Sequence, residues 1–122
     1  MKKINSIGWF ELSVNDIERA KDFYNKLFGW EYKLMQGSDS YWTIYTGENS
    51  IGGGFNLKTT SEDNGNALIL YVEVENINNT LKTAVNSGGS IIKEKTLITE
   101  NSGYYGLLKD ADGNMIGLWT KG

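Results

Sequence analysis

The stretch GWFELSVNDIERAKDFYNKLFGW, residues 8–30, decides the fold. Apolar and polar residues alternate up to Val14, which predicts a strand over residues 4–14. From Asn15 to Phe28 apolar residues recur every three or four positions, which predicts an amphipathic helix. Asn15 and Glu18 have the spacing of a capping box, and Gly29 provides a stop. The stretch therefore begins a strand and helix unit with definite boundaries.

Three short β-rich runs follow this helix, separated by turn-forming residues, at 30–35, 41–46 and 51–57. The first unit is therefore predicted to be βαβββ. Its last run contains Gly52, Gly53 and Gly54, which favour a bulge or a close backbone approach. No helix follows these glycines, so they do not form a phosphate-binding loop.

The same pattern begins again after a polar connection over residues 58–66. A strand is predicted over 67–74 and a helix over 77–87, closed by Gly88 and Gly89. Three β-rich runs complete the second unit, at 91–98, 104–108 and 115–120. A shift of 60 places Asp16 on Asn76, and in the last hairpin a shift of 65 places Gly52 on Gly117. The chain is predicted to contain a duplicated module.

The composition narrows the function. The 122 residues suit one compact domain, and the net charge of -3, without a basic cluster, argues against a nucleic-acid partner. No run approaches membrane-spanning length and no secretory signal precedes the first strand, so we expect a soluble cytoplasmic protein without a membrane partner. The absence of cysteine and histidine removes thiolate chemistry and the commonest general base and metal ligand.

Several motifs in order carry a family resemblance: residues 11–16, 20–24, 27–30, 71–74, 103–110 and 112–114. Together they make the chain resemble the vicinal oxygen chelate superfamily, which includes glyoxalase I, bleomycin-resistance proteins and extradiol dioxygenases. The resemblance implies an α+β fold with two tandem βαβββ modules in a curved, cup-like mixed sheet and helices on the outside. It also implies one domain, with module 1 at about 1–57, a linker at 58–66 and module 2 at about 67–122. Members often dimerise, so we expect a homodimer.

The resemblance also locates the metal site used by the superfamily's enzymes. Its four positions fall on Trp9, on Gly52 or a neighbour, on Ile69 and on Gly117. An indole, an isoleucine and two glycines offer no side-chain donor to a divalent ion. We therefore expect no metal and no cofactor.

Strand alternation predicts which side chains line the cup. Trp9 and Glu11 share a face in the first strand, as Ile69, Tyr71 and Glu73 do in the fifth, and rings from later strands could add walls. The alternative is that these rings fill a core, although tyrosine and tryptophan have polar tips that suit a wet cavity. The predicted ligand-binding residues are Trp9, Glu11, Trp42, Ile69, Tyr71, Glu73, Tyr105 and Trp119, with Ile44, Leu107, Met115 and Gly117 beside them.

Three functions follow from this prediction. The first is a metal-free protein that binds a small, planar or cationic molecule, with Glu11 and Glu73 supplying charge beside aromatic rings. The second is a lyase or isomerase similar to glyoxalase I, in which Glu11 and Glu73 bind a metal or act as catalytic general acid and base without histidine. The third is a dimeric interaction or regulatory module without a small ligand. Both carboxylates could also be rim groups or structural partners of lysine.

Overall fold

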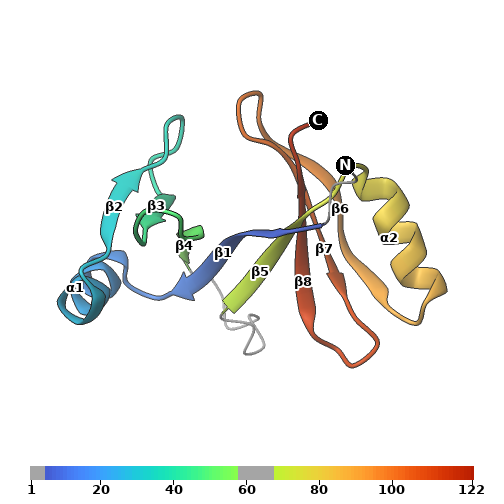
Figure 1. The fold of residues 1–122 in the computed structure, drawn as a ribbon, viewed down its shortest axis with the longest axis horizontal. Helices are drawn as coiled ribbons and strands as arrows, with labels where there is room; N and C mark the ends of the chain where they lie inside the picture. The colour runs from blue at the N-terminus through green and yellow to red at the C-terminus, as the bar shows by residue number, and fades with distance from the viewer. Residues whose placement is uncertain (1–4, 58–67) are drawn as a thin grey trace. The chain divides into compact units, whose positions relative to one another are not determined.

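The computed structural model describes residues 5–57 and 68–122, so the predicted linker at 58–66 lies outside the described residues. It confirms an α+β fold built from two βαβββ modules in tandem (Figure 1). Two compact units are present: residues 9–69 form one, and residues up to 8 join 70–122 in the other. Neither helix within the described ranges is long and apolar enough to cross a membrane.

The first module contains the elements drawn from blue to green in Figure 1. Its strand order is β2-β3-β4-β1, with β4 parallel to β1 and the other pairs antiparallel. The return of β4 beside β1 completes a four-stranded sheet. The elements are β1 (Ile7–Val14), α1 (Ile17–Phe28), β2 (Glu31–Leu34), β3 (Trp42–Tyr45) and β4 (Gly52–Leu57).

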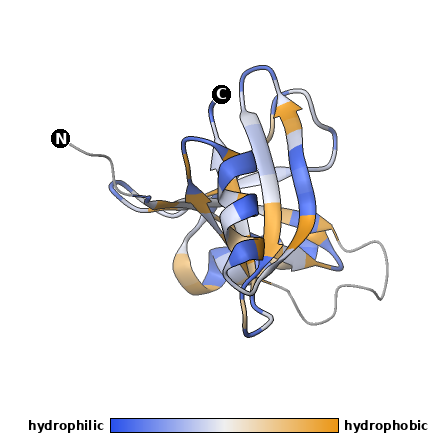
Figure 2. Ribbon diagram, turned by 90° about the vertical axis from the view of Figure 1, so that its right-hand side faces the viewer, coloured by the Kyte–Doolittle hydropathy of each residue, from blue (hydrophilic) through white to orange (hydrophobic). Residues whose placement is uncertain are grey.

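The second module repeats this topology, with strand order β6-β7-β8-β5 and β8 parallel to β5. Its elements are β5 (Leu68–Glu73), α2 (Ile77–Asn86), β6 (Ser90–Thr99), β7 (Gly103–Lys109) and β8 (Met115–Thr120). Figure 2 shows β6 with a hydrophilic middle between hydrophobic ends, and β6 pairs with β7 through several register shifts. The identical order of the four strands confirms the predicted duplication.

Each helix packs on one face of the sheet of its own module. In the first module the buried cluster consists of Phe10, Ala20, Ile44 and Phe55. In the second it consists of Val74, Ile77, Leu81, Leu108 and Leu118. The opposite face of each sheet is free of its helix, and Trp9, Glu11, Tyr71 and Glu73 lie on this face.

The helix boundaries follow from caps, with one correction. Asp16, and not Asn15, is the N-cap of α1: its extended backbone lets Oδ1 accept a hydrogen bond from the Arg19 amide at 3.0 Å. The predicted capping box of Asn15 and Glu18 is therefore wrong by one residue. Gly29 ends the helix at φ +72°, where a residue without Cβ avoids strain.

The strand register changes which glycine of the first module corresponds to Gly117 of the second. Asp16 and Asn76 cap corresponding helices, which fixes a shift of 60 and places Glu11 on Tyr71. Glu11 lies opposite Gly54 in the β1/β4 pair, and Tyr71 lies opposite Gly117 in the β5/β8 pair. Gly117 therefore corresponds to Gly54 and not to Gly52.

Candidate functional site

Three side chains form a hydrogen-bonded chain on the helix-free face of the first module. The indole N–H of Trp9 donates to the Tyr41 hydroxyl at 3.1 Å, and this hydroxyl donates to Glu11 Oε2 at 3.0 Å. Trp9 and Glu11 project from alternate positions of β1, whereas Tyr41 immediately precedes β3. All three are partly buried. The chain fixes the Glu11 carboxylate in one orientation.

Glycines in β4 leave the room that this arrangement needs. A Cβ at Gly54 would collide with the Tyr41 hydroxyl, and a Cβ at Gly52 would lie 3.4 Å from Cζ3 of Trp9. On the other face a Cβ at Gly53 would collide with the Phe10 ring. The predicted close approach to the backbone is confirmed at Gly53 and Gly54, whereas a Cβ at Gly52 would make only an ordinary contact. The space left by the missing Cβ atoms is occupied by side chains of the first module itself.

Burial dominates the electrostatics of Glu11. Loss of solvent raises the pKa of its carboxyl, and the hydrogen bond from Tyr41 opposes the shift only in part. Burial and the nearby Glu11 carboxylate also raise the pKa of the Tyr41 hydroxyl, which therefore remains a neutral donor at physiological pH. No lysine or arginine within the described ranges forms an ion pair with Glu11. The carboxylate is oriented and partly desolvated, and it has a neutral partner.

The helix-free face of the second module is aromatic. Tyr71 is buried, and a Cβ at Gly117 would collide with its ring. Glu73 and Tyr105 both lie opposite Trp119, whose indole N–H donates to the Ser102 carbonyl at 2.6 Å. These residues share one face of the module, as strand alternation predicted.

Two side chains of β3 lie on the helix-covered face, although the sequence placed them in the cup. Ile44 belongs to the buried cluster under α1, and Trp42 packs against this cluster, with Nζ of Lys21 on α1 3.7 Å from its ring centroid. The face assigned to Trp42 and Ile44 is therefore wrong, because β3 pairs Ile44 with Gly53 and so with the side of Phe10. Ile69, the last residue of the compact unit 9–69, is buried.

The prediction missed Tyr41, although strand alternation contained a signal for it. Residues at 41 and 42 point to opposite faces of a strand, so Tyr41 shares the face of Glu11 once Trp42 is assigned to the helix side. Its contact with Glu11, 30 positions away in the chain, depends on sheet pairing that a single sequence does not specify.

The side chains at the expected metal positions do not fit a divalent ion. Trp9 donates its indole N–H to Tyr41, and Gly52, Ile69 and Gly117 have no donor atom in a side chain. Across residues 5–57 and 68–122 no group of three or more acidic, histidine or cysteine side chains is placed to hold a metal.

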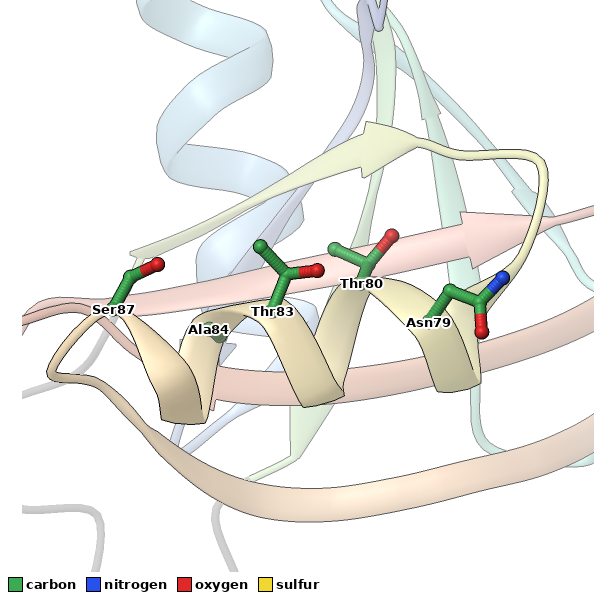
Figure 3. A pocket seen from close by; sticks show the side chains of 5 residues that line it. All are labelled: Asn79, Thr80, Thr83, Ala84 and Ser87. Atoms are coloured by element: carbon green, nitrogen blue, oxygen red, sulfur yellow. The ribbon is translucent and has the colours of Figure 1, made fainter.

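The compact unit that joins residues up to 8 with 70–122 has surface pockets at two places. One, of about 350 Å³, is lined by Asn79, Thr80, Thr83, Ala84 and Ser87, and Figure 3 shows its hydroxyl groups along one side of α2. The other, of about 300 Å³, is lined by Asn5, Glu73, Val74, Glu75, Thr120 and Lys121. The first contains no titratable group. The second places Glu73 beside another carboxylate and a lysine.

Comparisons with known proteins agree with this architecture. The family model described as Glyoxalase/Bleomycin resistance protein/Dioxygenase superfamily matches residues 6–118. A search of curated proteins found no match. The structure of methylmalonyl-CoA epimerase from Mycobacterium tuberculosis is similar at a TM-score of 0.70 and 14% identity, over 95% of this chain and 87% of that one.

Two further solved structures show the same likeness. A hypothetical protein from Bacillus halodurans C-125 aligns at a TM-score of 0.71 and 13% identity, over 98% of this chain and 96% of that one. A superfamily member from Vibrio splendidus 12B01 aligns at 0.64 and 12% identity, over 96% and 99%. At such low identities these structures support the fold alone.

Proposed function

The chain belongs to the glyoxalase/bleomycin resistance protein/dioxygenase superfamily, and we propose that it is a metal-independent binder of a small cationic molecule. The proposed site is the cluster of Glu11, Tyr41 and Trp9 on the helix-free face of the first module. One observation carries the proposal: Glu11 is oriented and partly desolvated, and it has no basic partner within the described ranges.

A cationic ligand would supply the positive charge that the Glu11 carboxylate lacks among the described residues. Desolvating a charge is costly unless an opposite charge or several hydrogen bonds compensate. The Tyr41 hydroxyl provides one neutral hydrogen bond to Oε2, which leaves lone pairs on both carboxylate oxygens. An amidinium or guanidinium group could donate to those lone pairs in parallel.

Trp9 favours a flat cation over a compact one. Its ring lies over Gly52, and its indole N–H is held by Tyr41, so its position is fixed. A planar cation beside the carboxylate would gain cation–π attraction from this ring. A single carboxylate is a poor site for a divalent metal, which needs several oxygen ligands around one point.

Benzamidinium and benzamide form a matched pair of probes for this proposal, since they share a ring and differ in charge. Titration by calorimetry and tryptophan fluorescence in EDTA should show binding of benzamidinium and much weaker binding of benzamide. Glu11→Gln should weaken benzamidinium binding by about 10-fold to 100-fold, the usual range for a charge-assisted hydrogen bond. The exposed Glu31→Gln is the control. Equal binding of both probes, or binding only with added metal, would contradict the proposal.

A second candidate function is supported by the raised pKa of Glu11. A carboxyl whose pKa is raised by burial is better suited to accept and return a proton, as an isomerase requires. One solved structure with this fold is named methylmalonyl-CoA epimerase, which suggests methylmalonyl-CoA as the first substrate to assay. Deuterium uptake into this substrate in D₂O that is lost in Glu11→Gln would favour catalysis over binding alone.

A further inference from the structure

The loop between β2 and β3, residues 35–41, is closed by hydrogen bonds that end at Tyr41. The Ser38 hydroxyl oxygen accepts from the backbone N–H of Tyr41 at 3.0 Å and from that of Ser40 at 3.2 Å. The backbone N–H of Met35 donates to the Tyr41 carbonyl at 2.8 Å, and that of Ser38 donates to the Met35 carbonyl at 3.0 Å. Both backbone polar groups of Tyr41 are thus bonded within this loop.

Tyr41 depends on this loop because it lies outside the paired strands. The register of β2 and β3 ends with Leu34 opposite Trp42, one residue after Tyr41 in the chain. The Tyr41 hydroxyl nevertheless reaches over Gly54 of β4 to Glu11 on β1. Since this hydroxyl is the far end of a long side chain, a small rotation of the Tyr41 backbone would displace it beyond hydrogen-bonding distance. The loop therefore determines how the Glu11 carboxylate is oriented.

The corresponding hairpin of the second module contains the same local hydrogen bond. Thr99 Oγ1 accepts from the backbone N–H of Ser102, three positions later, at 3.0 Å. The Ser102 carbonyl in turn accepts from the Trp119 indole at 2.6 Å. In each module a hydroxyl side chain thus holds the turn residue that contacts an aromatic or carboxylate group of the helix-free face. The second module provides a matched control for the first.

We propose that Ser38 is a positioning residue of the binding site: by holding the loop, it places the Tyr41 hydroxyl where it orients Glu11. The effect on affinity rests on the proposed function, whereas the placement of Tyr41 is a property of the free protein. Ser38 acts through Tyr41 and not through contact with the ligand. Its contribution to affinity should therefore disappear when residue 41 can no longer donate a hydrogen bond.

A double-mutant cycle with benzamidinium separates positioning from general support of the fold. Ser38→Ala should weaken binding by about 3-fold to 10-fold, the factor that one hydrogen bond is usually worth. In a Tyr41→Phe background the same substitution should change the affinity by less than about 2-fold. Ser38→Asn should bind as the wild-type protein does, because its side-chain oxygen can accept from the same backbone N–H groups. Equal losses in both backgrounds would overturn the proposal.

The indole N–H resonances in an NMR spectrum test the placement of Tyr41 without any ligand. Trp9 donates to the Tyr41 hydroxyl, so its resonance, identified by its loss in Trp9→Phe, should move in Ser38→Ala. Thr99→Val removes the equivalent bond of the second module and should move the Trp119 resonance instead. A Trp9 resonance that stays in place in Ser38→Ala, or that moves as much in Thr99→Val, would overturn the proposal. A Trp9 resonance that moves only in Ser38→Ala, in a protein that does not bind benzamidinium, would support the positioning role and overturn the proposed function.

Discussion

Each module has a strand glycine opposite a residue of the neighbouring parallel strand, but the two glycines leave space for different groups. In the first, Glu11 lies opposite Gly54, and the space above this glycine admits the Tyr41 hydroxyl that orients the carboxylate. In the second, Tyr71 takes the place of Glu11, and its own ring occupies the space above Gly117. A shared strand glycine thus supports a charged group in one module and aromatic packing in the other.

The helices of the two modules also differ in how deeply they bury their apolar side chains. In α2, Ile77 and Leu81 are 0% and 1% exposed, whereas α1 fully buries only Ala20 and leaves three large apolar side chains exposed, Phe23, Leu27 and Phe28. The second module therefore has the deeper aliphatic core. We infer that the second module serves mainly as scaffold and that the first carries the polar chemistry and the exposed aromatic surface.

The largest expected effect tests this difference in core depth. Leu81→Ala removes a buried side chain from α2 and should lower the free energy of unfolding by about 2–5 kcal/mol, through lost transfer energy and a cavity. Leu27→Ala on α1 removes the same atoms from an exposed position and should change it by less than about 0.5 kcal/mol. Urea denaturation of both variants provides the measurement. Equal losses would show that the two helices are packed alike.

Gly117→Ala should have the next largest effect. The added methyl group would meet Cγ and Cδ2 of Tyr71, the part of the ring nearest its backbone, which cannot move without displacing the whole side chain. Overpacking of this kind costs about 1–3 kcal/mol. Gly8→Ala is the matched control, because nothing lies within 4 Å of a Cβ there. A thermal melt that drops for both variants equally would disprove the role assigned to the Tyr71 ring.

Gly54→Ala should cost less stability and more function. Here the methyl group meets the far end of Tyr41, which can swing away, so we expect a loss of about 1 kcal/mol, the low end of overpacking. The displaced hydroxyl would release both Trp9 and Glu11, and benzamidinium binding should fall to the level of Glu11→Gln. Comparing affinity and melting temperature in the two glycine variants separates the roles. Full binding by Gly54→Ala would mean that Tyr41 does not orient the carboxylate.

Sequence patterns predicted the repeated elements because periodicity, caps and turns are local properties of the chain. Gly29 and Asn76 are boundary residues whose backbone role can be read without a structure. The Tyr41 contact and the face of Trp42 depend on which strands pair and in what register. A shift by one residue reverses every side chain of a strand, so short β3 could not be assigned from its own four residues.

The smallest expected effect is a change in the pH dependence of stability at Glu11. Burial raises the pKa of this carboxyl above the ordinary 4.5, so the folded protein keeps its proton to a higher pH than the unfolded chain does. Over that interval the native state binds more protons, and the free energy of unfolding contributed by Glu11 falls as pH rises. Glu11→Gln cannot titrate, and its amide oxygen can still accept from Tyr41.

The variant should therefore match the wild-type protein below pH 4.5 and become more stable than it as pH rises, until the difference levels off above the folded pKa. Chemical denaturation from pH 4 to pH 8 measures this difference, with Glu31→Gln, at an exposed position of β2, as the comparison variant. A difference of the opposite sign, in which Glu11→Gln loses stability as pH rises, would mean that a positive group already compensates Glu11 in the free protein. The Glu11 carboxylate would then not need a cationic ligand. The inference that the first module carries the polar chemistry would fail as well.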